Sequence, residues 1–120
     1  MKPKGVIFDF NGTLLWDTHL HNRAWDRFLE NHKINMTDSE KDKKIHGKNN
    51  RDILRTIIHK NLTDREIFSL AMEKEQIYQD CCIEENIQLA EGVTDYFAYL
   101  AGNSIPFTIA TASGIENIDF

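Results

Sequence analysis

The chain has 120 residues, with 14 Lys and Arg against 19 Asp and Glu, and 41% of its residues are apolar. The net charge of -5 (14 minus 19, with His neutral) is typical of a mildly acidic globular protein. This charge excludes a nucleic-acid binder that depends on basic patches. No apolar run approaches the roughly 20 residues that cross a bilayer, and the N-terminus lacks the apolar segment of a signal peptide.

The two cysteines indicate a compartment. Cys81 and Cys82 are adjacent, and neighbouring residues reach disulfide geometry only with strain. They also lack the C-x-x-C spacing of a zinc or redox site. Two free thiols fit a reducing environment, so the sequence predicts a cytoplasmic protein.

Two apolar runs predict β-strands. Residues 5–9 (Gly-Val-Ile-Phe-Asp) end in a carboxylate, and residues 105–111 (Ile-Pro-Phe-Thr-Ile-Ala-Thr) form the second run. Continuous apolar runs with β-branched residues are typical of buried strands in a parallel sheet. Pro106 fits only at the beginning of its strand, because it has no N–H for the ladder.

The pattern between these strands is helical. Apolar residues recur at helical spacing from about 18 to 32, 50 to 60, 63 to 82 and 93 to 101. Thr37-x-x-Glu40 and Thr63-x-x-Glu66 indicate capping boxes that open helices near 37 and 63. A further helix is expected to start near 114.

Counting residues predicts the topology. A parallel crossover needs about a dozen residues, so the helix near 93–101 is sufficient. Residues 17–88 are then surplus and predict a four-helix cap, inserted into an α/β, Rossmann-like core formed by residues 1–16 and 89–120. Two strands make too small a sheet to be stable alone. Either the chain is part of a longer protein, or another chain supplies the remaining strands.

The strand ends carry the candidate chemistry. Asp9 ends the first strand, where α/β sheets place their sites. The N–H groups around residues 10–13 can converge as an anion-binding nest. Thr111 ends the second strand, and the amides of Ala112 and Ser113 are expected at a helix N-terminus. Together they predict a phosphate site.

These residues resemble a known family. Residues 6–14 (Val-Ile-Phe-Asp-Phe-Asn-Gly-Thr-Leu) are similar to the first motif of the haloacid dehalogenase-like hydrolases, D-x-D-G-T-L. Residues 109–113 resemble the second motif, whose Thr or Ser holds a phosphoryl group. The helical insertion is similar to the cap of the β-phosphoglucomutase-like branch, as are His21, Ala24-Trp25 and residues 47–52. The resemblance covers the whole chain, which would be about the first half of such a protein.

The resemblance implies a mechanism. Asp9 would attack a phosphate ester to form an aspartyl-phosphate that water later hydrolyses. Mg²⁺ would bind Asp9, the backbone carbonyl of Asn11 and a further acid, because like charges otherwise repel one another during the attack. Thr111, with the amides of Phe10, Asn11 and Ala112, would hold the phosphoryl oxygens.

The resemblance also implies that the cap closes over the site and contacts the leaving group of a small phosphorylated metabolite. Candidate contacts are His21, Lys48 and Arg51. Each also fits an ordinary helical position, Lys48 and Arg51 as solvated charges and His21 as a packed or exposed residue. The sequence gives neither the substrate nor the oligomeric state.

Position 11 departs from the family pattern. The phosphatases and mutases carry a second Asp there, as general acid and base, and an amide cannot exchange a proton. Three outcomes stay open: a substrate with a good leaving group such as an acyl phosphate, another residue that moves the proton, or ligand binding without turnover. The third and fourth motifs, a Lys or Arg and an acidic pair, would follow residue 120, so these 120 residues alone are expected to lack full activity.

Three alternative functions follow from these departures. A phosphonatase-like hydrolase would use Lys48 as a Schiff base, since burial can activate a lysine. Haloacid dehalogenation fits less well, because Asn11 does not match that motif either. A non-catalytic module that binds a phosphorylated ligand is the alternative outside enzymes.

Overall fold

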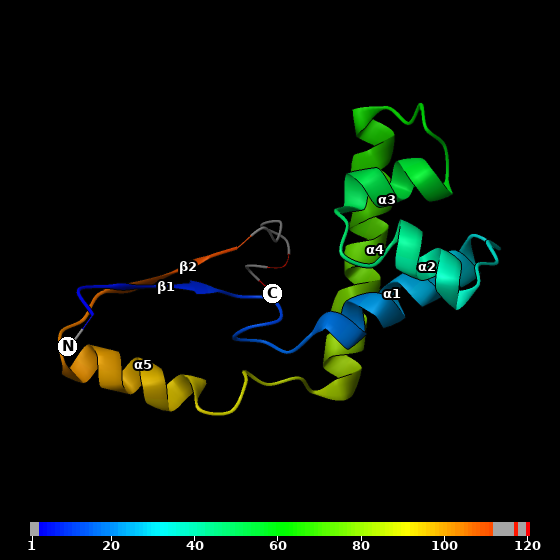
Figure 1. Cartoon of the computed structure of the whole chain (residues 1–120). Helices are drawn as coiled ribbons and strands as arrows, with labels where there is room; N and C mark the ends of the chain where they lie inside the picture. The colour runs from blue at the N-terminus through cyan, green and yellow to red at the C-terminus, as the bar shows by residue number, and fades with distance from the viewer. Residues whose placement is uncertain (1–2, 112–116, 118–119) are drawn as a thin grey trace. The chain divides into compact units, whose positions relative to one another are not determined.

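The computed structural model describes residues 3–111, 117 and 120 (Figure 1). It has the predicted α/β composition, with the helical segments inserted between the strands. The elements in chain order are β1 (Val6–Asp9), α1 (Thr18–Asn31), α2 (Asp38–Lys44), α3 (Asn50–Ile57), α4 (Asp64–Glu85), α5 (Val93–Gly102) and β2 (Phe107–Ala110). The chain divides into two compact units, one of residues 1–19 and 85–120 and the other of residues 20–84.

The first unit contains the sheet. β1 and β2 pair in parallel, from Val6 opposite Phe107 to Asp9 opposite Ala110. Pro106 directly precedes β2, and its carbonyl accepts a hydrogen bond of 3.1 Å from the amide of Val6. The prediction that this proline stands at the strand's beginning is confirmed. Because the strands are parallel, their carboxyl ends meet at one edge of the sheet.

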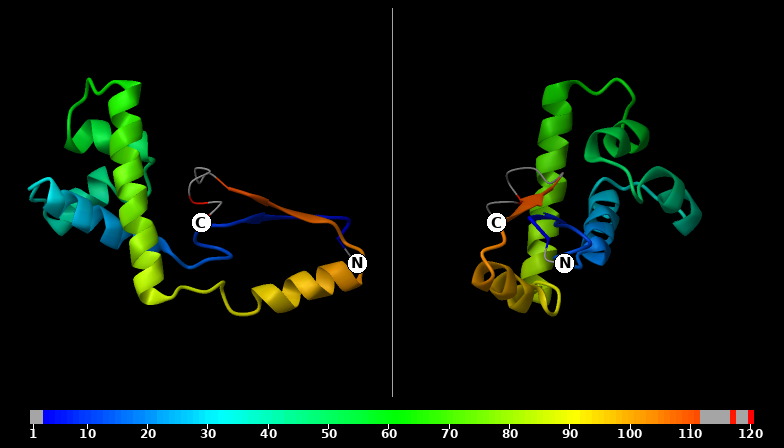
Figure 2. Two further views of the ribbon diagram at one scale, coloured as in Figure 1. Left: turned by 180° about the vertical axis from the view of Figure 1, so that it is seen from behind. Right: turned by 60° about the vertical axis from the view of Figure 1, so that its left-hand side comes forward.

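Helix α5 packs on one face of the sheet through aromatic rings (Figures 1 and 2). The ring of Phe8 meets Tyr96 and Phe97 edge-on, with centroids 5.8 and 5.3 Å apart. Phe97 also stacks on Phe107, with centroids 4.8 Å apart. Successive strand residues face opposite sides, so Ile7 points away from α5 and is 74% exposed.

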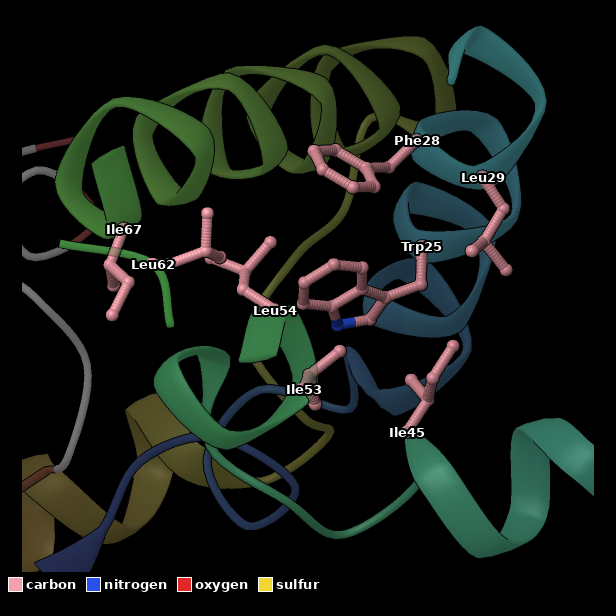
Figure 3. Close-up of a cluster of buried hydrophobic side chains, with 8 residues drawn as sticks. All are labelled: Trp25, Phe28, Leu29, Ile45, Ile53, Leu54, Leu62 and Ile67. Carbon is pink, nitrogen blue, oxygen red and sulfur yellow. The ribbon is translucent and has the colours of Figure 1, made fainter. Parts of the chain in front are cut away.

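The second unit has its own hydrophobic core (Figure 3). Apolar side chains from α1, α3, α4 and the segments between them converge on one another, and burying each contributes about 1.5–3 kcal/mol. The cluster consists of Trp25, Phe28, Leu29, Ile45, Ile53, Leu54, Leu62 and Ile67. The four helices with this core match the predicted helical insertion, and whether the insertion serves as a cap stays a prediction.

The helix starts follow the predicted capping residues. The hydroxyl oxygens of Thr37 and Thr63 accept hydrogen bonds of 3.2 Å from the amides of Glu40 and Glu66. Asn49, which the sequence analysis did not single out as a cap, does the same for α3 by accepting from the amide of Asp52 at 2.9 Å. Side-chain acceptors at these positions satisfy amides that have no partner within the helix.

Some element boundaries differ from the prediction. Helix α3 ends at Ile57 instead of about residue 60, because the chain turns where the amide of Asn61 donates to the ring of His59 at 3.0 Å. The units divide at 19/20 and 84/85, and the domain limits at 17 and 88 stay predictions. The helix expected near 114 lies outside the described residues, apart from position 117.

Candidate active site at the carboxyl ends of the strands

Asp9 is the last residue of β1, opposite Ala110. Its side chain is exposed, and within the part of the chain that the structure describes it has no hydrogen bond or ion pair. A carboxylate that is accessible and not already paired can act as a nucleophile or as a ligand for a hard cation. The side chain of Asp9 is thus accessible, and its roles as nucleophile and metal ligand stay predictions.

The turn after β1 is closed by its own backbone. The carbonyl of Phe10 accepts from the amides of Thr13, Leu14 and Leu15 at 3.1, 2.9 and 3.2 Å, and the amide of Gly12 donates to Leu15 at 2.8 Å. Gly12 has φ 76°, which a residue without Cβ adopts readily. The amides of Gly12 and Thr13 therefore donate hydrogen bonds within the turn. The predicted anion nest would then have to use the amides of Phe10 and Asn11.

Asn11 connects the two strand ends. Its Oδ1 lies 3.4 Å from the hydroxyl of Thr111, 100 positions away in sequence. Its Nδ2 donates to Oδ2 of Asp17 at 2.6 Å, and the amide of Gly12 donates to Oδ1 of Asp17 at 3.2 Å. The structure therefore brings the predicted residues Asn11 and Thr111 together. Ala112 and Ser113 lie outside the described residues.

Asp17 is a site residue that the sequence analysis missed. Its side chain is 1% exposed, although an Asp directly before a helix is usually an exposed capping residue. Its position after an apolar stretch, Leu14-Leu15-Trp16, is the only signal that the sequence offers. The hydrogen bonds from Asn11 and Gly12 satisfy its carboxylate oxygens, which makes burial tolerable.

The helical unit contains a second polar cluster. The ammonium of Lys74 donates to Nδ1 of His21 at 2.7 Å and to Oε1 of Glu75 at 3.0 Å. Asn50 donates to the same Glu75 oxygen at 2.8 Å. The ring of His21 stacks on Tyr78, with centroids 3.9 Å apart and planes 4° from parallel. His21 is therefore held by α4.

Lys74 and Glu75 were not predicted as functional residues. Their exposed fractions are 2% and 4%. The Lys74 ammonium also lies 5.4 Å from the ring centroid of Trp25 and 5.5 Å from that of Tyr78, distances at which a ring face attracts a cation. The available signal was a lysine on the apolar stripe of a helix, four residues before Tyr78.

The other two predicted contacts of the helical unit differ from each other. Arg51 pairs with Asp64 at 2.7 Å, and this guanidinium lowers the pKa of the Asp64 carboxyl. The side chain of Lys48 is exposed and forms no hydrogen bond or ion pair with the described residues. Of these two residues, Lys48 is the one whose cation no described side chain holds, but it lacks the burial that would activate a Schiff-base lysine.

The donor set at the strand ends suits a hard cation. The carboxylate of Asp9 and a backbone carbonyl are oxygen ligands, which Mg²⁺ prefers. Among residues 3–111, 117 and 120, no three His, Cys, Asp or Glu side chains gather closely enough to hold a metal. The residues therefore fit part of a Mg²⁺ site. In the described part of the chain, no helix is long and apolar enough to span a membrane.

The fold and the strand-end residues match one protein family. Residues 6–119 match the profile described as haloacid dehalogenase-like hydrolase. The chain belongs to this family, as its first and second motifs predict. A comparison with curated proteins gave no match.

Solved structures agree with this assignment. An Entamoeba histolytica hydrolase of the family (family IA, variant 3) is 33% identical with a TM-score of 0.88. The match covers 98% of this chain and 52% of the Entamoeba protein. The structure of CbbY from Rhodobacter sphaeroides in complex with phosphate is 18% identical with a TM-score of 0.75, and the match covers 97% of this chain and 54% of CbbY. A β-phosphoglucomutase from Clostridium difficile is 20% identical with a TM-score of 0.70, and the match covers 93% of this chain and 52% of the mutase. The last two likenesses concern the fold alone, and the chain spans about half the length of these proteins.

Proposed function

We propose that the complete protein catalyses Mg²⁺-dependent hydrolysis or transfer of a phosphoryl group, from an ester or acyl phosphate of a small cytoplasmic metabolite, through an aspartyl-phosphate at Asp9. The observation that carries this proposal is the exposed carboxylate of Asp9 at the sheet edge where Asn11 and Thr111 meet. Membership of the hydrolase family supports the reaction class.

In the proposed reaction an oxygen of Asp9 attacks phosphorus, and the bond from phosphorus to the leaving oxygen breaks. A water then attacks the aspartyl-phosphate, which releases inorganic phosphate, frees the Asp9 carboxylate and leaves one proton for solvent. The hydroxyl of Thr111 and the amides of Phe10, Asn11 and Ala112 would hold the phosphoryl oxygens. Bound Mg²⁺, with Asp9 and the carbonyl of Asn11 as ligands, would offset the charge repulsion.

Asn11 bears on the substrate class. An alkoxide leaving group needs a proton, and general acid help is worth about 10²–10⁴-fold in rate. An amide cannot give that proton, whereas a carboxylate leaves an acyl phosphate without one. The proposal therefore favours an acyl phosphate over a sugar phosphate ester, unless another group supplies the proton.

The helical unit would serve as the cap that contacts the leaving group. Lys48 is the strongest of the three candidates, because it is exposed and has no partner among the described residues. Arg51 is already paired with Asp64, and His21 is bound to Lys74. The phosphate in the CbbY crystal gives indirect support for a phosphorylated ligand.

The second candidate is a module that binds a phosphorylated ligand without turnover. Asn11 favours it, because its amide donates to Asp17 and offers no exchangeable acid. A phosphate-release assay separates the two. The complete protein would be given acetyl phosphate and a panel of sugar phosphates, with and without Mg²⁺. Metal-dependent release that Asp9→Asn abolishes supports the enzyme, and binding without release from any substrate supports the module.

A further inference from the structure

We propose that Asp17 is a positioning residue that fixes the side-chain amide of Asn11 in one orientation, with Oδ1 directed to Thr111 and the reacting groups. The two ends of an asparagine amide are chemically opposite, since the nitrogen only donates and the oxygen only accepts. Which end faces the site decides what Asn11 can bind. The inference rests on the proposed function for the reaction, but the orientation is measurable without activity.

Asp17 selects the orientation because both of its carboxylate oxygens accept, one from Nδ2 of Asn11 and the other from the amide of Gly12. It lies 2.6 Å from Nδ2 of Asn11, so a rotated amide would set two acceptor oxygens against each other. At 1% exposure no bulk water screens that repulsion. The amide of Gly12 holds the second carboxylate oxygen at 3.2 Å, which fixes the carboxylate itself.

The consequence is that Asn11 presents an acceptor at the sheet edge. Its Oδ1 is 3.4 Å from the hydroxyl of Thr111, the other predicted phosphoryl contact. An acceptor there suits a water or a hydroxyl group and repels a phosphoryl oxygen. In the proposed reaction Asn11 would therefore orient the water that attacks the aspartyl-phosphate, without taking its proton. The phosphoryl oxygens would be held by the hydroxyl of Thr111 and the backbone amides, and not by the side chain of Asn11.

Two variants test this positioning. Asp17→Asn keeps the side-chain shape but can donate or accept, so it no longer selects an orientation for Asn11. The double variant Asn11→Asp/Asp17→Asn reverses the direction of the hydrogen bond between the two positions, because the amide at position 17 now donates to the carboxylate at position 11. The other carboxylate oxygen at position 11 remains an acceptor that faces Thr111. Asp95→Asn is the matched control, because Asp95 is exposed in the same unit and has no partner among the described residues.

The first measurement is the NMR signal of the Asn11 side-chain amide in the complete protein, assigned by its loss in Asn11→Ser. A bond to a buried carboxylate shifts one amide proton downfield and slows its exchange. We expect Asp17→Asn to return the chemical shift and the exchange rate of this proton to ordinary values, and Asp95→Asn to leave the two quantities unchanged. An Asn11 signal that is unchanged in Asp17→Asn would overturn the proposal.

The second measurement is kinetic. We expect Asp17→Asn to lower kcat about 10–100-fold with KM changed less than about twofold, since misplacing a positioning group by about 1 Å costs up to about 10²-fold. With acetyl phosphate, whose leaving group needs no proton, the exchanged pair should recover most of kcat. An exchanged pair as slow as Asp17→Asn would contradict the proposal. If the unaltered protein releases no phosphate, the proposed function fails, and the NMR result still decides the positioning role.

Discussion

The ammonium of Lys74 lies 2.7 Å from Nδ1 of His21, although 53 positions separate the two residues in sequence. The contact joins α4 to α1 inside the helical unit, where Lys74 is 2% exposed. Glu75 supplies the opposite charge at 3.0 Å. A buried ion pair is sensitive to the loss of one partner, because the charge left behind is neither solvated nor paired.

Removing Lys74 alone should therefore destabilise the protein strongly. We expect Lys74→Met to lower the free energy of unfolding by about 3–5 kcal/mol, since Glu75 would stay buried without its cation. The double variant Lys74→Met/Glu75→Gln should be more stable than Lys74→Met, because it buries no unpaired charge and its glutamine oxygen can still accept the hydrogen bond from Asn50. Urea unfolding measures both. The exposed Lys60→Met should change stability by no more than about 0.5 kcal/mol. Equal losses in the single and double variants would contradict the account.

The nucleophile assignment makes a direct prediction. Asp9→Asn should abolish turnover of every phosphorylated substrate in the complete protein, because an amide does not form the aspartyl-phosphate. Asp95→Asn, an exposed change in the same unit, should keep full activity. Phosphate release measures both. Release by the Asp9→Asn variant with any substrate would rule out the proposed role of Asp9.

The helical core should respond to a cavity. Leu54 is fully buried in the cluster of Figure 3, whereas Phe68 on α4 is 67% exposed. We expect Leu54→Ala to cost about 2–5 kcal/mol through lost burial and the cavity left behind. Phe68→Ala should cost less than about 0.5 kcal/mol. Chemical denaturation compares them, and similar losses would show that the cluster is not the core of its unit.

The ion pair between Arg27 and Glu84 gives a pH prediction. The guanidinium of Arg27 hydrogen-bonds Glu84 and lowers the pKa of that carboxyl. A lowered folded-state pKa contributes stability above the unfolded value, and that stability is lost as pH falls through the folded value. Arg27→Gln should thus be less stable than the unaltered protein at neutral pH, with the difference vanishing in acid.

Thermal unfolding between pH 2 and 7 measures this difference. Both side chains are partly exposed, at 39% and 55%, so added salt should reduce the effect. Lys60→Gln removes the same charge from a residue without a partner among those described, and its profile should follow the unaltered one. If the difference in stability between Arg27→Gln and the unaltered protein increased as the pH fell, the prediction would be contradicted.

The proposed cap contacts should separate in the kinetics. We expect Lys48→Gln to raise KM about tenfold or more, because a cation that pairs with a phosphorylated substrate contributes about 1.5–3 kcal/mol. Arg51→Gln should raise it less, since Arg51 is already bound to Asp64. Substrate-saturation curves measure both. A larger effect at Arg51 would reverse the assignment and point to a rearranged Arg51–Asp64 pair.

The sequence by itself determined the order and type of the elements. Apolar periodicity indicated the helices, and Thr37 and Thr63 marked two helix starts through their capping bonds. The motif around Asp9 identified the family. These features depend on residues close together in the chain, where spacing and residue type are sufficient. The limits of α3 were less accurate, because the turn at His59 depends on a side-chain bond.

Only the tertiary structure decided which polar groups are buried together. The sequence analysis singled out neither Asp17, directly before a helix, nor Lys74, on the apolar stripe of another helix. The structure shows Asp17 bound to Asn11, and Lys74 bound to His21. Spacing along the chain does not reveal such pairs, because a charge is buried only where the fold brings a partner to it. That partner can lie 6 residues away or 53.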